Sequence, residues 1–236
     1  REFHTKAFRI AVIFGIFGAV LAPISGDVAA KSVAKRQPIK LAAMEAHFET
    51  EKGASFLIGG IPDEKAETVK YGIKIPKLLS FLVDGNPNSE VKGLKDFPKE
   101  HWPPVAVTHF AFQIMIFLGT VMMGISVLYL FALFFKKNWL EKHWLLKLFI
   151  IATPFGYIAL EAGWTVTEVG RQPWIIYGIM KTAEAVTPMP GIQYSFYLFT
   201  LIFISLSLII IFLLRRQIKM VPYLYDSTDP LFHTKK

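Results

Sequence analysis

The sequence predicts an all-α integral membrane protein with four transmembrane helices and one long extracytoplasmic loop. The composition supports this fold class, because 53% of the residues are hydrophobic and the mean hydropathy is +0.42. The charged residues, 19% of the total, collect in blocks that separate long apolar runs. Alternation of apolar runs and charged blocks is typical of a chain that crosses a membrane several times.

Residues 1–25 contain the first predicted span, an apolar run from Ala7 to Ile24 that ends at Gly26 and Asp27. The run reaches the lower limit of length for a membrane helix. Residues 26–104 are rich in Lys, Glu, Gly and Pro, so we expect them to form the long loop. The chain begins without an initiator methionine or a signal-peptide pattern, and we therefore expect it to be the later part of a longer protein.

Residues 105–236 hold the other three predicted spans and a short cytoplasmic tail. The second span runs from Val105 to Phe135 without a formal charge, the third from about Leu145 to Val169, and the fourth from Ile192 to Leu214. Pro154 predicts a kink near the middle of the third span.

Basic residues fix the expected orientation of the spans. They collect at the N-terminal end, at 136–147 and at 215–219, which are alternate ends of the four spans. Because Lys and Arg gather on the cytoplasmic side of short loops, these ends are predicted to be cytoplasmic. Residues 26–104 and the turn after residue 169 then face outside. This topology accounts for the net charge of +8, and no nucleic-acid binding is expected. The absence of cysteine excludes disulfides, thiolate metal sites and cysteine nucleophiles.

The most informative stretch follows the third apolar run and reads Glu-Ala-Gly-Trp-Thr-Val-Thr-Glu-Val-Gly-Arg-Gln-Pro-Trp, residues 161–174. Glu161, Trp164, Glu168 and Arg171 are separated by three, four and three positions, so they share one helix face. Ionisable side chains within a membrane are costly and by default indicate function. The competing interpretation is that Glu168 and Arg171 form a salt-bridged helix end at the water interface.

This pattern of Gly-Trp, Glu and Gly-Arg-Gln-Pro-Trp resembles subunit I of cytochrome bd, a membrane quinol oxidase that reduces oxygen to water. A Lys-Leu-Ala-Ala-x-Glu motif at 40–45 and a Phe-x-Ile-Met motif at 112–115 match the same family. The resemblance implies the C-terminal portion of that subunit, of the type with a short quinol-binding loop. It implies a heme enzyme of the bacterial cytoplasmic membrane that oxidises quinol, reduces O2 and contributes to the proton motive force.

The resemblance makes Lys40 and Glu45 the quinol-binding residues. They lie in the stretch 37–48, which is predicted to be a short amphipathic helix whose apolar face rests on the membrane surface. A carboxylate can accept a proton from quinol while a cation stabilises the developing quinolate. From the residues alone, solvated helix positions are the simpler interpretation, and a separation of five residues is poor for mutual contact.

In the second span, the chemistry of the side chains alone favours His109 as a heme ligand. The resemblance instead implies that Met115 ligates a low-spin heme b, opposite a His that lies upstream of this chain. Met and His ligation raises the reduction potential of a heme, which suits an acceptor of quinol electrons. A packing role is the other interpretation of Met115. Many relatives have Arg where Gln113 stands, which puts a propionate or charge-tuning role at this position in doubt.

At the third span, the resemblance implies that Glu168 lies on or beside the iron of a high-spin heme b. It makes Trp164 an aromatic residue between hemes and Arg171 a partner of heme propionates. Glu161, one turn before Trp164, is a candidate for a proton path. Heme d, whose axial His lies upstream of this chain, completes the implied oxygen-reducing site.

The implied partners are the upstream half of the same subunit, subunit II, a small single-helix subunit and the lipid bilayer. The fourth span carries no Asp, Glu, Lys, Arg or His, so it is predicted to be scaffold or a contact with a partner subunit.

Two other functions fit parts of the pattern. A secondary transporter would use Glu161, Glu168 and the kink at Pro154 as a coupling-ion site, but it predicts an internal repeat that is not visible among these four spans. A heme-free structural subunit would leave the intramembrane carboxylates without a partner, which is energetically unfavourable.

Overall fold

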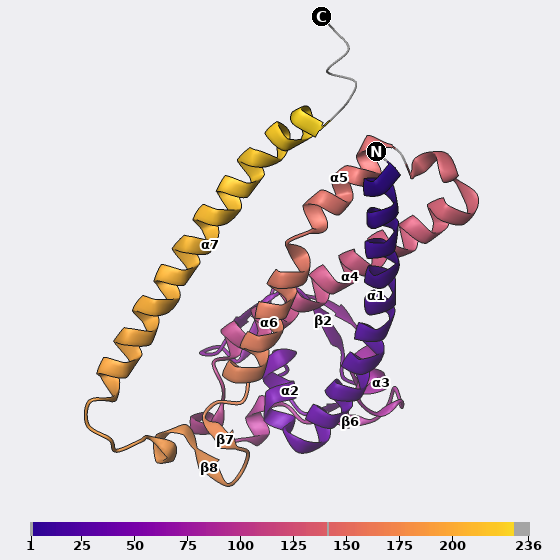
Figure 1. The fold of residues 1–236 in the computed structure, drawn as a ribbon. Coiled ribbons are helices and arrows are strands. Elements are labelled where there is room, and N and C mark those ends of the chain that lie inside the picture. Colours follow the sequence, from indigo (N-terminus) through magenta and orange to yellow (C-terminus); the bar gives the residue numbers. More distant parts are fainter. Residues whose placement is uncertain (1, 141, 229–236) are drawn as a thin grey trace, which may run out of the picture. The chain divides into compact units, whose positions relative to one another are not determined.

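The computed structural model describes residues 2–140 and 142–228 and is mainly helical (Figure 1). Within these residues, four helical segments are long and apolar enough to cross a membrane: Thr5–Arg36, Val105–Phe135, His143–Val169 and Ile192–Met220. The predicted all-α membrane fold with four spans is therefore confirmed. The chain divides into two compact units, residues 1–185 and 186–236, and each is described by itself.

Helix α1 (Glu2–Arg36) carries the first span. It continues past the expected end at Gly26 and contains Pro23 in its interior. Asp27 and Lys31 form an ion pair at 2.6 Å across one helical turn. Ion pairs at this spacing favour a helix, so the polar residues after Ile24 extend α1 instead of ending it.

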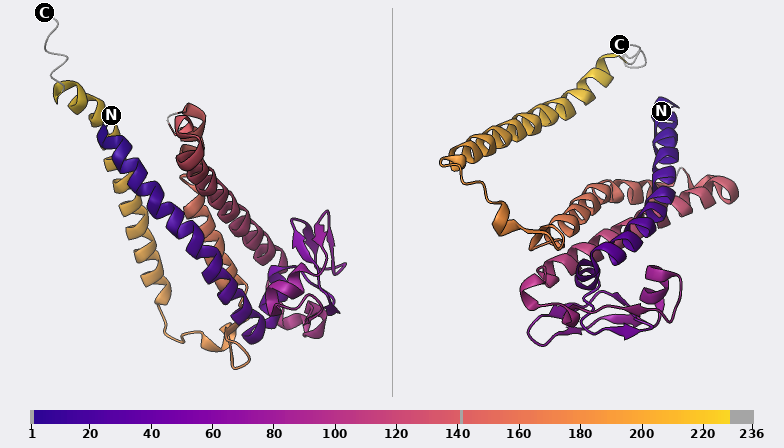
Figure 2. Two further views of the ribbon diagram at one scale, coloured as in Figure 1. Left: turned by 90° about the vertical axis from the view of Figure 1, so that its right-hand side faces the viewer. Right: turned by 90° about the horizontal axis from the view of Figure 1, so that it is seen from below.

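Helices α4 (Val105–Phe135) and α6 (Phe155–Val169) run side by side in opposite directions (Figures 1 and 2). They are connected by a 3₁₀ turn, η3 (Lys137–Trp139), and helix α5 (His143–Ala152). The third span is interrupted between α5 and α6 at Pro154, which confirms the predicted kink. Proline removes a backbone donor and clashes with the preceding turn, which explains the interruption.

At the seam between α4 and α6, glycines at intervals of seven residues along α6 and its C-terminal cap face larger side chains at intervals of seven residues along α4. A Cβ atom added at each of three glycines would contact one side chain of α4: Gly156 faces Met122, Gly163 faces Met115 and Gly170 faces Thr108. Seven residues are about two helical turns, so each set lies along one side of its helix. Glycines at such a seam let helices approach closely within a membrane.

The segment between the first two spans folds into a layer of short elements beside α4 (Figure 2). Its helices are α2 (Pro38–Met44) and α3 (Leu78–Asp84), and its 3₁₀ turns are η1 (Leu94–Asp96) and η2 (Lys99–His101). Its strands are β1 (Glu51–Lys52), β2 (Phe56–Ile58), β3 (Ile61–Asp63), β4 (Thr68–Lys70), β5 (Ile73–Ile75) and β6 (Glu90–Val91). Three antiparallel pairs form, β1 with β6, β2 with β5 and β3 with β4. The sequence had indicated turns here but no strands.

Helix α2 is buried along its length, from Ile39 to Met44. Leu41 packs into a cluster with Leu79 and Val91, whereas Met44 packs against α4. The expectation that α2 lays an apolar face on the membrane surface is therefore wrong, because protein covers that face.

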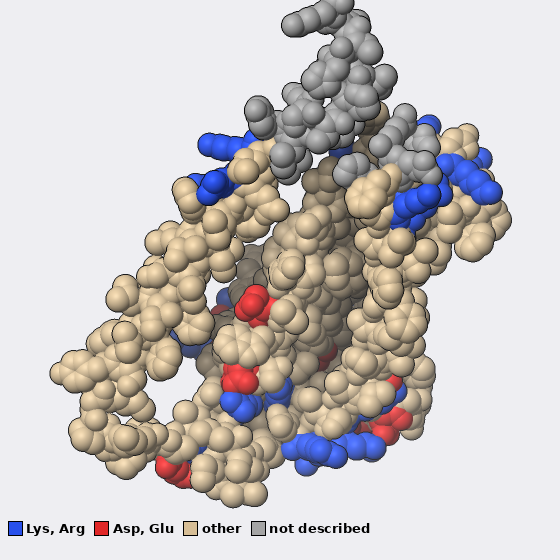
Figure 3. All heavy atoms as spheres, in the orientation of Figure 1, with Lys and Arg blue, Asp and Glu red and all other residues tan. Residues whose placement is uncertain are grey.

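After α6 the first unit ends in the antiparallel strands β7 (Trp174–Ile176) and β8 (Met180–Lys181) and the 3₁₀ turn η4 (Thr182–Ala185). The second unit contains helix α7 (Ile192–Thr228), whose side chains from 192 to 220 are all exposed. In Figure 3, Lys and Arg gather near helix ends, whereas the middle parts of the helices are mainly uncharged. Exposed apolar helices of this kind require lipid or other protein around them.

Candidate functional site

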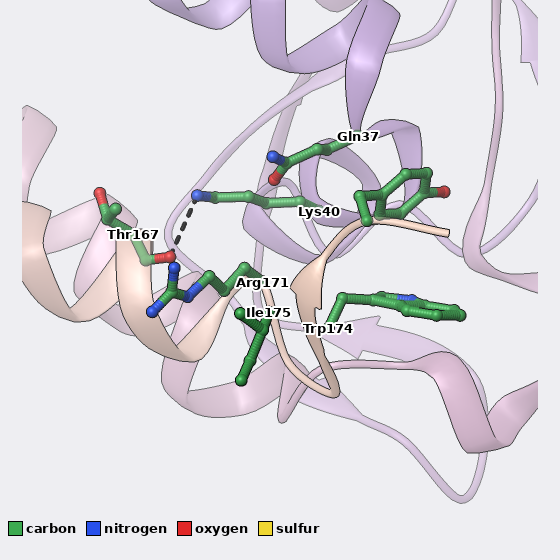
Figure 4. Close-up of a pocket in the computed structure, with 7 residues that line it drawn as sticks. Gln37, Lys40, Thr167, Arg171, Trp174 and Ile175 are labelled. Atoms are coloured by element: carbon green, nitrogen blue, oxygen red, sulfur yellow. Dashed lines mark hydrogen bonds between the residues drawn. The ribbon is translucent and has the colours of Figure 1, made fainter. Parts of the chain in front are cut away.

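Lys40 lies in a cavity of about 160 Å³ between α2 and the end of α6, hereafter the Lys40 cavity (Figure 4). Its side chain is 8% exposed, and its Nζ donates a hydrogen bond of 3.3 Å to the Thr167 carbonyl. Gly170 makes room for this contact. A Cβ atom there would lie 2.4 Å from the Val166 carbonyl oxygen and 3.4 Å from Lys40 Cε. The fold thus brings the motif that contains Lys40 into contact with the stretch that contains Thr167, which lies 127 positions later in the sequence.

Charged groups surround the Lys40 ammonium. Burial lowers the pKa of Lys40, the nearby Arg171 lowers it further, and Glu168 partly offsets both effects. Arg171 pairs with Glu168 three positions earlier, so these two residues do form the salt-bridged helix end that was the competing interpretation. The pair does not satisfy every polar atom. Among the described residues, Arg171 Nε and Gln37 Oε1 are buried without a hydrogen-bond partner, and both residues line the Lys40 cavity.

Glu45 lies away from the Lys40 cavity and lines a second cavity of about 350 Å³, hereafter the Glu45 cavity. Five helical positions correspond to a rotation of about 140°, which explains why Lys40 and Glu45 leave α2 on different sides. Glu45 is 4% exposed, and its burial raises its pKa to about 8, against a smaller opposing effect of a hydrogen bond from the Leu57 backbone. The two predicted quinol residues are therefore both buried, but they do not share a cavity.

Met115 lies on the seam between α4 and α6. Its sulfur would be 3.0 Å from a Cβ atom added at Gly163, so this glycine provides the space that the thioether uses. Met115 also packs against the cluster formed by Met44, Phe112 and Val166, which places the end of α2 directly beside it. The Met115 side chain is neither fully buried nor fully exposed.

His109 and Gln113 have a role that sequence reasoning missed. His109 is fully buried, with Nδ1 2.8 Å from the Met44 carbonyl oxygen and Nε2 3.2 Å from the Gly59 carbonyl oxygen. Gln113 accepts a bond from the Gly59 N–H and donates one to the Leu57 carbonyl. Both nitrogens of His109 are thus occupied, so the interpretation of His109 as a heme ligand does not fit this structure. The signal available in the sequence was their spacing of four, which puts both on one face of α4.

Glu161 and Trp164 lie on the side of α6 that is turned away from α4, where Trp164 is 63% exposed. Ala162 and Val166 form the opposite, buried side. Within the described residues Glu161 has no ion pair. A carboxylate on such a face costs about 2.5–3.5 kcal/mol in lipid if ionised.

The comparisons with known proteins agree with one another. The family model described as cytochrome bd terminal oxidase subunit I matches residues 1–222. A subunit I of this family from Bacillus subtilis (strain 168) is 36% identical over 221 residues, which are 94% of this chain and 50% of the relative. The cytochrome bd ubiquinol oxidase subunit 1 of the same organism is 31% identical over 230 residues, which are 92% of this chain and 49% of that protein.

A solved structure, that of the bd oxidase from Geobacillus thermodenitrificans, superposes with a TM-score of 0.80 at 36% sequence identity. The superposition covers 93% of this chain and 50% of the chain in that structure. This chain therefore spans about half the length of the relatives that it matches. Since the family model covers almost the whole chain, the chain belongs to the cytochrome bd terminal oxidase subunit I family.

Proposed function

We propose that this chain is the part of a membrane quinol:oxygen oxidoreductase that carries its quinol-oxidising residues and contributes ligands to two b hemes. The observation that carries the proposal is the burial of Lys40 in α2 and of Glu45 at the C-terminal cap of α2, between the end of α6 and the seam that holds Met115. Burying two ionisable side chains on one short helix is costly and calls for a specific task. One of the matched relatives is named a ubiquinol oxidase subunit.

Glu45 is assigned to proton uptake from the quinol hydroxyl. A carboxyl group whose pKa is raised to about 8 can both gain and lose a proton near neutral pH, which is what a general base requires. Lys40 is assigned to the stabilisation of the quinolate. Within the described residues its ammonium makes one hydrogen bond, to the Thr167 carbonyl, so other N–H donors remain for an oxygen anion. The unpaired Gln37 Oε1 and Arg171 Nε add one acceptor and one donor in the same cavity.

The residues around α6 fit the heme groups that the family implies. Met115 would hold a low-spin heme b through its thioether, and Glu168 would lie at the iron of a high-spin heme b. Arg171 has a buried Nε–H without a partner, which suits a propionate. Trp164 and Glu161 lie on the exposed face of α6, where the hemes, including heme d, would cover them, and Glu161 would serve a proton path. Together the hemes would supply one-electron transfer and the binding of oxygen.

The proposed setting is the bacterial cytoplasmic membrane, with residues 26–104 and the turn after α6 on the extracytoplasmic side. The hydrogen bond from Lys40 to Thr167 supports the placement of both segments at the same side. The exposed faces of α1, α6 and α7 would contact lipid, the upstream half of the subunit, subunit II and a small single-helix subunit. Release of protons outside and their uptake inside would contribute to the proton motive force.

Two measurements on the purified complex test the proposal. The first is a reduced-minus-oxidised optical spectrum of the wild type, Met115→Leu and Glu168→Ala. We expect bands of low-spin b, high-spin b and chlorin-type heme, with the first lost in Met115→Leu and the second altered in Glu168→Ala. A wild-type complex without heme bands would overturn the proposal.

The second measurement is the steady-state oxidation of duroquinol. Lys40→Met is expected to raise KM about tenfold to a hundredfold, because the variant loses one charged hydrogen bond, which contributes about 1.5–3 kcal/mol. Glu45→Gln is expected to lower kcat, because its amide cannot accept the proton. Unchanged kinetics in both variants would remove these residues from the quinol site.

A further inference from the structure

The Glu45 cavity shares no lining residue with the Lys40 cavity. Its wall combines the apolar residues of β2 and β4 with six ionisable side chains: Glu45, His47, Glu49, Glu51, Glu67 and Lys74. Glu45 is deeply buried, whereas Glu49 and Glu51 are exposed, so the cavity leads from the interior of the molecule toward its surface.

An unusual helix end places Glu45 and His47 in this one cavity. At the end of α2, the His47 N–H bonds the Ala42 carbonyl at 2.8 Å and the Ala46 N–H bonds the Ala43 carbonyl at 3.2 Å. This is the Schellman arrangement, in which the residue after the cap is left-handed and usually glycine. Here it is Ala46, with φ of 48°. A left-handed alanine costs about 1–2 kcal/mol, so the surrounding structure must hold this turn in place.

The segment at η1 holds the turn. The Leu94 N–H donates to the His47 carbonyl at 2.9 Å, and the Lys95 N–H donates to the Phe48 carbonyl at 3.0 Å. Gly93 allows this approach, because a Cβ atom there would lie 2.4 Å from the Phe48 carbonyl oxygen. The positions of Glu45 and His47 are therefore fixed by backbone contacts on both sides of the turn.

The inner part of the cavity contains two unpaired polar atoms. Among the described residues, Glu45 Oε2 and His47 Nε2 are both buried without a hydrogen-bond partner. The Val91 backbone lies close enough to the His47 ring to raise its pKa slightly, against the larger effect of burial. A neutral imidazole carries one N–H and one lone pair, so the unpaired Nε2 can accept or donate a proton according to the tautomer. Burial lowers the pKa of His47, so the neutral ring is favoured.

The charges that act on His47 come from residues 49–51 and from β5. Glu51 and Glu49 raise its pKa, whereas Lys74 on β5 lowers it. Glu49 and Glu67 are both paired with Lys95. Among the described residues Glu51 has no such pair, so an exposed, free carboxylate stands at the mouth of the cavity beside His47.

We propose that the Glu45 cavity is the exit route for protons released by quinol oxidation, with His47 as the relay between Glu45 and the outer surface. This inference rests on the proposed function. Oxidation of one quinol releases two protons and two electrons in two successive steps. In each step one quinol O–H bond breaks, one electron leaves the quinol for the one-electron acceptor of the proposed function, and the proton forms the O–H bond of the Glu45 carboxylate. That O–H bond then breaks as the proton moves to Nε2 of His47. The imidazolium gives the proton to water at the mouth of the cavity, where Glu51 attracts it, and neutral His47 is restored.

The test compares His47→Gln with the wild-type complex in duroquinol oxidation. Glutamine cannot carry the proton, so kcat is expected to fall about tenfold to a hundredfold. General acid–base catalysis typically changes a rate by about a hundredfold or more, so this expected fall is at or below that range. The KM and the heme spectrum should remain unchanged, and the solvent deuterium isotope effect on kcat should increase. His47→Glu, which keeps a titratable group, should recover part of the rate. His143→Gln is the matched control, because His143 begins α5 and lies outside both cavities.

A second electron donor separates this inference from the proposed function. Tetramethyl-p-phenylenediamine supplies electrons without releasing a proton, so its oxidation should be equally fast in the wild type and His47→Gln. A wild type that oxidises no quinol would refute the proposed function. If the wild type and His47→Gln oxidise quinol at the same rate, the relay alone is refuted. The relay is also refuted if His47→Gln loses the same fraction of its rate with duroquinol and with tetramethyl-p-phenylenediamine. If His47→Gln does not assemble, Glu51→Gln at the exposed mouth of the cavity is tested in its place. We expect a smaller fall in kcat for Glu51→Gln, and an unchanged kcat would refute the route.

Discussion

Replacing Gly163 by alanine tests whether this glycine positions the Met115 sulfur. The added Cβ atom would lie 3.0 Å from Met115 Sδ and 3.8 Å from its Cγ. Ordinary contacts begin near 3.4 Å, so the sulfur must move by a few tenths of an ångström. Overpacking of this kind costs about 1–3 kcal/mol, and the better helix propensity of alanine returns about 1 kcal/mol. We therefore expect a stability loss of about 0–2 kcal/mol together with a displaced Met115 thioether.

The displaced sulfur should be visible in the heme that Met115 is proposed to hold. Thioether ligation raises the reduction potential, so a weaker bond should lower the potential of the low-spin heme b and change its band in the difference spectrum. A redox titration of the purified complex measures both.

Gly156→Ala is the matched control for Gly163→Ala. It makes the same substitution on α6 two turns away, where the added Cβ atom would lie 3.9 Å from Met122 Sδ, an ordinary contact. This variant should keep the wild-type spectrum and potential. If Met115→Leu abolishes the band while Gly163→Ala behaves like Gly156→Ala, the positioning role of Gly163 is refuted.

Three further predictions concern the segment between the first two spans. Glu45 has a raised pKa, so folding favours its neutral form and the wild type should lose stability as the pH rises from about 5 to 8, at most about 1.4 kcal/mol per pH unit. Glu45→Gln should remove this dependence, measured as Tm against pH. Gln113→Leu should lower stability by about 1–3 kcal/mol, because two backbone groups near β2 lose their partner, without changing the heme spectrum. Gly93→Ala forces a Cβ atom against the Phe48 carbonyl and should make residues 45–97 sensitive to limited proteolysis, whereas Gly26→Ala, with open space around it, should not.

Each of these predictions has an outcome that contradicts it. A Tm that falls equally with pH in the wild type and Glu45→Gln would show that another group titrates. A shifted heme spectrum in Gln113→Leu would show that Gln113 acts on a heme and not only on β2. Equal proteolysis of the Gly93 and Gly26 variants would mean that the turn after α2 is not held by η1.

The membrane spans could be predicted from sequence because they depend on local composition. Long uncharged runs and the proline at 154 were sufficient to predict α4, α5, α6 and the start of α7, although α7 continues past the expected end at Leu214 to Thr228. The end of α1 was not, since Gly26 and Asp27 signalled a stop that the Asp27–Lys31 pair and the following residues override. The short strands beside α4 escaped detection because each has only two or three residues, too few for an alternating pattern.

The candidate site was predictable as a set of residues but not as an arrangement. Motif spacing put Glu168 and Arg171 together, and the structure pairs them. No spacing rule could show that Lys40 reaches Thr167, because the contact depends on how the chain returns after three further helices. His47 escaped notice because its position in the Glu45 cavity depends on a left-handed alanine, a conformation that is expected mainly for glycine or asparagine.

The separation of Lys40 and Glu45 has a physical consequence for the proposed reaction. Quinol oxidation yields electrons and protons that must leave in different directions, because charge separation requires that protons do not follow the electrons to the oxygen side. Because Lys40 and Glu45 are five residues apart, Lys40 is turned toward the end of α6, where Glu168 and Arg171 lie. Glu45 is turned toward the Glu45 cavity. Met44, between them, packs beside Met115. A spacing of three or four would place both side chains on one face of the helix, so the five-residue interval that is poor for mutual contact is the one that lets Lys40 and Glu45 line separate cavities.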